Sequence, residues 1–182
     1  STLLTRRPAL VAGLALFGLM AVTRSHHVGD WNSLPDASWA IFFLAGLWLA
    51  PRVWLPLLIA FAVGIDWFAT SVGGVSDYGM TPAYWMLLPT YAALYAGGRL
   101  VAGKSVVWLA GGALASAVAA ELLSGGSFYF GSGYFAVTSL TGYAGEFARY
   151  FPNSLGVMAL YVSVAVLGRA GVEVDRPAHA GR

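Results

Sequence analysis

The stretch from Asp36 to Ser71 reads DASWAIFFLAGLWLA-PR-VWLPLLIAFAVGIDWFATS, and it decides the fold. Two apolar runs, Asp36–Ala50 and Val53–Ser71, are separated only by Pro51 and Arg52. As a single helix they would be far longer than the roughly 20 residues that cross a bilayer. Arg52 would then lie at mid-bilayer, where a charge is costly. The stretch therefore favours a hairpin of two membrane helices over one kinked helix.

The composition of the whole chain supports a membrane protein. Of its 182 residues, 58% are hydrophobic and only 10% are charged, against about 25% charged in soluble domains. The chain has no cysteine, which excludes disulfides, thiolate-ligated metals and thiol nucleophiles. Its ten basic residues form no run of the kind that binds nucleic acid. We expect an all-α integral membrane protein and a single transmembrane domain over residues 1–182.

Similar apolar segments recur along the chain and predict a bundle of six transmembrane helices. They are residues 8–23, 36–50, 53–71, 81–97, 105–123 and 152–167. Six crossings leave eight of the basic residues on one side of the membrane and only Arg24 and Arg149 on the other. By the positive-inside rule, both termini are then cytoplasmic.

The connections predicted on the outer side are the longer ones, and long connecting loops often carry function. They are residues 24–35, 72–80 and 124–151. The first contains His26 and His27, which are candidates for a metal or a ligand. Neighbouring histidines in a solvated loop can equally have no special role. Asp36, at the end of this loop, is expected to cap the second helix.

Two carboxylates are predicted at membrane depth. Asp66 and Glu121 each lie about 20 Å along their helices, in the outer third of the bilayer, where an ionisable group suggests function. Arg149 is the predicted partner of one of them. Tyr84 and Trp85 are expected near the same level. Acids that serve packing through such pairs, and aromatic residues that form an interfacial belt, are the structural alternatives.

Aromatic side chains also gather in or beside the predicted outer loops, at Tyr78, Tyr84, Phe128, Tyr129, Phe130 and Tyr134. Mixed with acids, histidines and glycines, they suit a large amphipathic ligand. Small residues mark expected helix contacts, among them Ala9 and Gly13 on the first helix.

Three strings carry a family resemblance: LPDASWAIFFLAG at 34–46, SDYGMTPAYW at 76–85 and RYFPNSL at 149–155. Together with the six short helices, they are similar to BtuM-type cobalamin transporters, which resemble the substrate-binding S-components of energy-coupling-factor vitamin transporters. The resemblance covers nearly the whole chain. It implies cobalamin uptake across the bacterial cytoplasmic membrane, with the vitamin captured in an outward-facing cavity that loops roof over.

The resemblance also implies a set of site residues. His27, Asp66, Tyr84 and Arg149 fall at family binding positions. Gly79 stands where the family has a cobalt-ligating cysteine, so cobalt–thiolate ligation and removal of the cyanide ligand are expected to be absent here.

Further residues complete the expected ligand site. Met80 adjoins Gly79, and His26 or His27 is a candidate cobalt contact. Secondary candidates for ligand contact are His26, Tyr78, Trp85 and Glu121. Ala9 and Gly13 are candidates for contact with a coupling module. Cobalamin is expected as the transported ligand, and the chain is expected to need no cofactor of its own.

An intramembrane enzyme is the alternative hypothesis. Asp66 and Glu121 would form its carboxylate pair, with a loop histidine as general base. Neither a zinc-protease His-Glu-x-x-His string nor a Gly-x-Ser-x-Gly nucleophile string occurs in the sequence, which favours the transporter.

Overall fold

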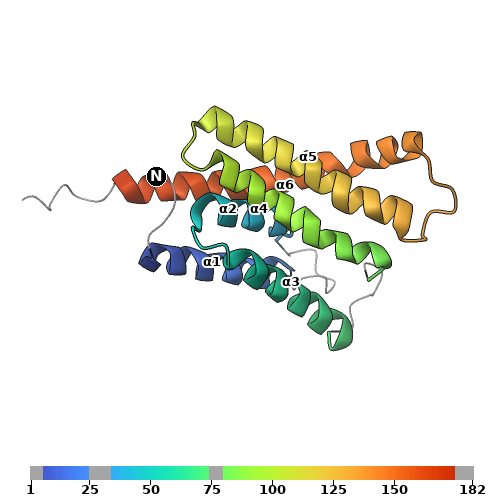
Figure 1. Ribbon diagram of the computed structural model, residues 1–182, viewed down its shortest axis with the longest axis horizontal. Coiled ribbons are helices and arrows are strands. Elements are labelled where there is room, and N and C mark those ends of the chain that lie inside the picture. The colour runs from blue at the N-terminus through green and yellow to red at the C-terminus, as the bar shows by residue number, and fades with distance from the viewer. Residues whose placement is uncertain (1–5, 25–33, 74–79, 175–182) are drawn as a thin grey trace, which may run out of the picture.

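The computed structural model describes residues 6–24, 34–73 and 80–174, and every element in these ranges is a helix (Figure 1). In chain order they are α1 (Arg6–Arg24), α2 (Ser38–Trp48), α3 (Trp54–Ser71), the 3-10 helix η2 (Pro82–Met86), α4 (Leu87–Val101), α5 (Val106–Gly131) and α6 (Leu140–Val174). Among these, four are long and apolar enough to cross a membrane: α1, α3, α5 and α6. An all-helical bundle of membrane character is confirmed.

The break predicted at Pro51 and Arg52 is present. α2 ends at Trp48 and α3 begins at Trp54, and the backbone N–H groups of Trp54 and Leu55 donate to the carbonyls of Pro51 and Arg52 across the turn. The cause is local, because proline disfavours helix in the residue before it and has no N–H to continue the ladder.

Helix α2 lies at the centre of the bundle. Nine of its 11 residues are buried, and at about 1.5 Å per residue it is roughly 16 Å long, too short to cross a bilayer alone. The Asp36 carboxylate accepts hydrogen bonds from the backbone N–H of Ser38 at 2.9 Å and from its hydroxyl at 2.6 Å. The sequence predicts Asp36 as the N-cap of α2, but the N-cap is Ala37. Asp36 stabilises the start of the helix from one residue earlier.

The closest packing joins α2 to α4, and we call it the α2–α4 seam. Gly46 lies against the Tyr95 carbonyl, and Gly98 lies against the Phe43 carbonyl. A Cβ atom at either glycine would overlap the backbone of the other helix. Next to these contacts the rings of Phe42 and Tyr91 stack, with their centroids 4.0 Å apart. The seam therefore depends on two residues that lack side chains.

The last two helices are longer than the sequence indicated. Residues 124–151 were expected to form an outer loop, but α5 continues to Gly131 and α6 already begins at Leu140. Pro152, expected to open the last helix, lies inside the 35-residue α6. Proline removes one hydrogen bond of a helix and its ring crowds the carbonyl four residues earlier, but long membrane helices tolerate it where neighbouring groups satisfy the freed carbonyl. The run Ser124–Ser127, typical of a loop, is helical within α5.

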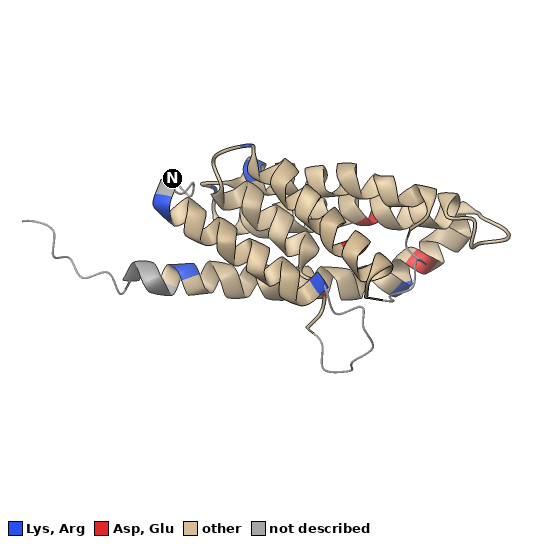
Figure 2. Ribbon diagram, turned by 90° about the horizontal axis from the view of Figure 1, so that it is seen from below, with Lys and Arg blue, Asp and Glu red and all other residues tan. Residues whose placement is uncertain are grey.

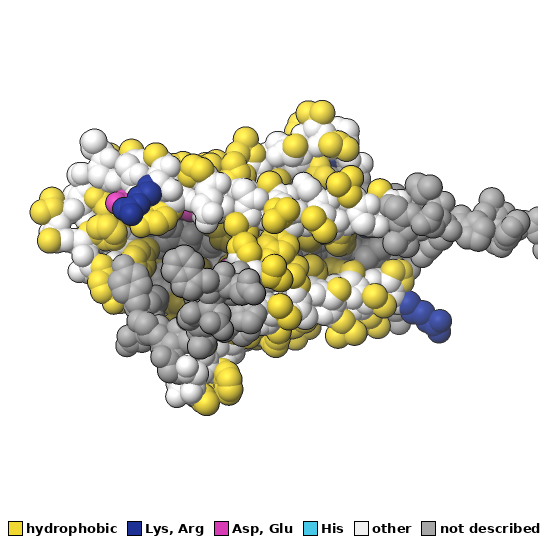
Figure 3. All heavy atoms as spheres, turned by 180° about the vertical axis from the view of Figure 1, so that it is seen from behind, with side chains coloured by type: hydrophobic (Ala, Val, Ile, Leu, Met, Phe, Trp, Pro, Cys, Tyr) yellow, Lys and Arg dark blue, Asp and Glu magenta, His cyan; other side chains and the backbone are white. Residues whose placement is uncertain are grey.

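The outer surface of the bundle is apolar. Large exposed side chains include Trp67, Phe68, Val107 and Trp108, and Figure 3 shows hydrophobic side chains over the face in view, with its Lys and Arg atoms near the two ends. In Figure 2 the Asp and Glu residues lie mostly in the half of the bundle away from the start of α1. Such a surface suits contact with lipid.

Candidate functional site

A cavity of about 780 Å³, open on one side, lies between α3, η2, α5 and α6. Among the described residues, α3 makes no extensive contact with α5 or α6, which leaves this space. The polar and charged side chains that line the cavity are Arg24, Asp66, Thr70, Tyr84, Glu121, Ser124, Tyr129, Tyr143, Glu146 and Tyr150. The volume is within the range of small-molecule sites, roughly 300–1,000 Å³.

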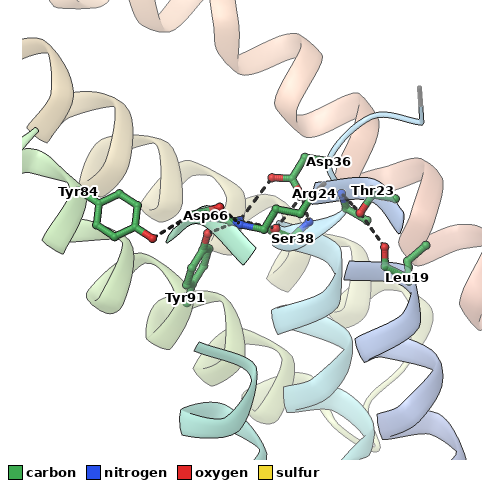
Figure 4. A network of polar contacts seen from close by, with 9 residues as sticks. Leu19, Thr23, Arg24, Asp36, Ser38, Asp66, Tyr84 and Tyr91 are labelled. Carbon is green, nitrogen blue, oxygen red and sulfur yellow. Dashed lines mark hydrogen bonds and ion pairs between the residues drawn. The ribbon is translucent and has the colours of Figure 1, made fainter. Parts of the chain in front are cut away.

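One wall is built on an ion pair between Arg24, the last residue of α1, and Asp66 of α3 (Figure 4). The Arg24 Nε atom donates to Asp66 Oδ1 at 2.7 Å, and a terminal nitrogen donates to Oδ2 at 2.6 Å. Arg24 is 6% exposed, so this bidentate pair is largely removed from solvent. Bidentate pairing of this kind is among the stronger polar interactions in proteins.

The other terminal nitrogen of Arg24 is also occupied. It donates to the Ser38 hydroxyl at 2.8 Å and to the Tyr91 hydroxyl at 2.7 Å, and it lies 3.6 Å from an oxygen of Asp36. Tyr84, from η2, donates its hydroxyl to Asp66 Oδ2 at 2.7 Å. We call these six residues the Arg24 network, and it joins α1, α3, η2 and α4 to the start of α2 (Figure 4).

The second carboxylate expected at membrane depth, Glu121, faces the same cavity from α5. It is 8% exposed, and its carboxylate has no hydrogen bond or ion pair with any residue in the described ranges. The Tyr143 hydroxyl donates to the backbone carbonyl of Glu121 at 3.1 Å, and not to its side chain. Within the described part of the chain the two acids therefore differ sharply, because both Asp66 oxygens accept hydrogen bonds and the Glu121 carboxylate accepts none.

Arg149 is not the partner of either acid, which corrects the sequence prediction. It is exposed, and its guanidinium lies 5.3 Å from the ring centroid of Tyr150. Neither ion pair between described residues involves it. The partner of Asp66 is Arg24, which is not among the site residues predicted from the sequence. Arg24 is one of two basic residues on the side that the positive-inside rule disfavours, and that exception was the available signal.

The other site residues predicted from the sequence differ in whether they line the cavity. Met80 and Tyr84 line the cavity, whereas Trp85 does not line it and is 67% exposed. His26, His27, Tyr78 and Gly79 lie outside the described residues. Within the described ranges no group of three or more His, Asp or Glu side chains could hold a metal ion.

Ala9 and Gly13, the candidates for a partner interface, are buried inside the bundle. Ala9 is 4% exposed, and Gly13 lies against the indole ring of Trp54 in α3. The exposed side of α1 presents other residues, Leu10, Val11 and Leu14.

Opposite the Arg24 network, aromatic side chains of α5 and α6, with Phe135 between them, form the other wall. Phe128, Tyr129, Phe135, Tyr143 and Tyr150 line it. The Tyr129 ring packs on Phe135 at 4.5 Å and on Tyr143 at 5.7 Å between centroids. Phe128 and Tyr129 were expected in or beside a loop, but α5 holds them. The cavity thus has one hydrogen-bonded ionic wall and one aromatic wall.

No protein-family model matches the chain, and no curated protein sequence matches it significantly.

Proposed function

We propose that this chain binds cobalamin or a related corrinoid and mediates its uptake across the bacterial cytoplasmic membrane. The observation that carries the proposal is that Asp66 and Tyr84, two positions that the BtuM resemblance assigns to ligand binding, are hydrogen-bonded to each other at the border of one cavity. They lie 18 residues apart, on α3 and η2.

The chemistry of the two walls supports a corrinoid. A corrin ring has broad faces and a rim of amide side chains, so it needs both flat apolar surface and hydrogen-bonding groups. The aromatic wall supplies the first, and Tyr84, Glu121 and Glu146 supply polar groups at the cavity. Because the cavity is open on one side, a ligand larger than its volume can extend beyond it.

The proposed topology has six crossings and both termini in the cytoplasm. Four long apolar helices and the segregation of basic residues support it. The short α2 crosses only together with the turns around it, and protein rather than lipid surrounds it. In this orientation the cavity opens outward.

The proposed mode of cobalt binding depends on the glycine at position 79. With glycine at the position of the family cysteine, we propose that cobalamin binds without a cobalt–sulfur bond from a thiolate and without thiol-dependent loss of cyanide. His27 is the proposed cobalt contact. A coupling module, if one takes part, binds at α1, where Leu10, Val11 and Leu14 offer exposed apolar surface.

Titration of the detergent-solubilised full chain with cyanocobalamin tests the proposal. We expect stoichiometric binding, seen as red corrinoid that stays with the protein through gel filtration. Colourless protein that binds neither cyanocobalamin nor aquocobalamin would contradict it.

The Gly79→Cys variant tests the alignment with the family. Restored sulfur should shift the cobalt absorption bands of bound cyanocobalamin and promote loss of cyanide. A spectrum identical to that of the unmodified chain would show that Gly79 is not the cobalt-facing position.

Single-cysteine labelling tests the topology, because the chain has no cysteine of its own. In intact cells a membrane-impermeant maleimide should label Asn32→Cys and spare Lys104→Cys. The reverse pattern would place the cavity on the cytoplasmic side and rule out capture from outside.

A further inference from the structure

Glu121 is the one charged group at the cavity that is both buried and unpaired among the described residues. Its side chain lines the cavity, the residue is 8% exposed, and no described residue pairs with its carboxylate. A carboxylate that no described residue pairs, and that faces a cavity lined largely by apolar and aromatic side chains, favours a hydrogen-bond donor beside it. A feature of this kind points to a group that arrives with a ligand.

The charges around the cavity define that group. Arg24 is the only basic residue that lines it within the described ranges, and the guanidinium is committed to Asp66, Ser38 and Tyr91. Among the described residues, Glu121 and Glu146 therefore face the cavity, and no basic side chain that lines it is free to balance them. An anionic group near Glu121 would be repelled, whereas an N–H donor would be attracted.

The local structure of α5 gives the Glu121 carboxylate its position. Gly125 lies one helical turn after Glu121, and the Glu121 carboxylate packs against it. A Cβ atom at residue 125 would collide with Glu121 Oε1. The aromatic rings of Tyr129 and Tyr143 border the same part of the cavity. Rings beside a carboxylate favour a cationic or amide nitrogen over a carboxylate group.

We propose that Glu121 accepts a hydrogen bond from an N–H group of the bound ligand and thereby fixes which edge of the ligand faces α5. For a corrinoid this donor is a primary amide of the rim, and for a cationic ligand it is an ammonium group. The inference rests on the proposed function in that it takes the cavity as the ligand site. It gives the two acids different roles: Glu121 accepts a hydrogen bond from the ligand, whereas Asp66 accepts its hydrogen bonds from Arg24 and Tyr84.

The test compares cyanocobalamin with derivatives in which one rim amide is hydrolysed to a carboxylate, titrated into the detergent-solubilised full chain. One of these carboxylate derivatives should bind about tenfold more weakly than cyanocobalamin, because the carboxylate that replaces its amide is repelled by the Glu121 carboxylate. In Glu121→Gln the amide side chain can donate to that carboxylate, so the difference should fall to about twofold or less. Tryptamine, an aromatic ammonium compound, is titrated in parallel.

Gly125→Ala is the second variant, because it displaces the carboxylate and leaves its charge in place. We expect it to reduce the preference for the amide over the acid by about threefold or more. Gly111→Ala, in the same helix with open space around an added Cβ, is the matched control and should leave the preference unchanged. If Glu121→Gln does not fold, Gly125→Ala decides the question alone.

The outcomes separate the two proposals. If cyanocobalamin binds but neither variant changes the preference, the role of Glu121 is overturned and corrinoid binding stands. If tryptamine binds and Glu121→Gln abolishes its binding while no corrinoid binds, corrinoid transport is overturned and the role of Glu121 stands. If neither probe binds the unmodified chain, both proposals are overturned.

Discussion

The α2–α4 seam and the cavity are built on opposite packing rules, although α4 contributes to both, since its Leu87 lines the cavity. At the seam, Gly46 and Gly98 let two backbones touch, and the core around them is closed. At the cavity, α3 stays apart from α5 and α6, and long polar and aromatic side chains border the space that remains. Residues without side chains fix the relative position of the helices, whereas residues with long side chains determine what can bind. Substitutions should therefore affect stability at the seam and at the buried Arg24–Asp66 ion pair, and affinity at the other side chains that line the cavity.

The largest effect is expected from Gly98→Leu at the seam. The new side chain would overlap the carbonyl of Phe43 and force α2 away from α4, so we expect a loss of more than about 4 kcal/mol in the free energy of unfolding. Unfolding in mixed detergent micelles measures this loss. Gly111→Leu, at an exposed glycine with open space around it, is the control and should fold normally. Equal stability of the two variants would show that the seam is not closely packed.

The next effect is expected from Asp66→Ala, which breaks the Arg24 network. Arg24 would remain buried without its bidentate acceptor, and breaking a buried pair in this way costs about 3–5 kcal/mol. The measured quantity is again the free energy of unfolding. The double variant Arg24→Met/Asp66→Leu removes both charges and should recover most of the lost stability. A double variant less stable than Asp66→Ala would contradict an ion-pair origin for the effect.

A smaller effect is expected from Tyr84→Phe, which removes one hydroxyl at the cavity. Loss of the hydrogen bond to Asp66 should weaken cyanocobalamin binding about fivefold, equivalent to about 1 kcal/mol. Tyr95→Phe removes a hydroxyl near Leu49, away from the cavity lining, and should leave affinity unchanged. If both variants lower affinity equally, Tyr84 has no direct role at the site.

The smallest effect is expected from Trp85→Phe. Trp85 neighbours Tyr84 in sequence, but it is 67% exposed and does not line the cavity. Stability and cyanocobalamin affinity should both stay within about 0.5 kcal/mol of the unmodified chain. A tenfold loss of affinity would place Trp85 in contact with the ligand and extend the site beyond the cavity.

The sequence predicted those features that have a local cause. Pro51 and Arg52 interrupt two apolar runs, so the turn between α2 and α3 followed from the sequence alone. Asp66 and Glu121 were placed at similar depth by counting along their helices, and both do line one cavity.

The predictions that were wrong, for Arg149 and for residues 124–127, also have a physical explanation. Depth along a helix does not say which way a side chain points around it, so Arg149 could not be distinguished from Arg24 as the partner of Asp66. The glycines and serines of residues 124–127 have low helix propensity and indicated a loop, but tertiary packing holds them in α5. That no described residue pairs with the Glu121 carboxylate depends on every neighbouring helix, and no local sequence pattern encodes it.

Pro152 has a mechanical consequence for α6. It cannot donate a backbone hydrogen bond, so the helix bends there at lower cost than within an uninterrupted ladder. The turns before it carry Tyr143, Glu146 and Tyr150, which line the cavity, whereas α6 supplies no member of the Arg24 network. Bending of α6 at Pro152 would move these side chains and widen or narrow the entrance of the cavity, while the five segments joined by the Arg24 network stay in place.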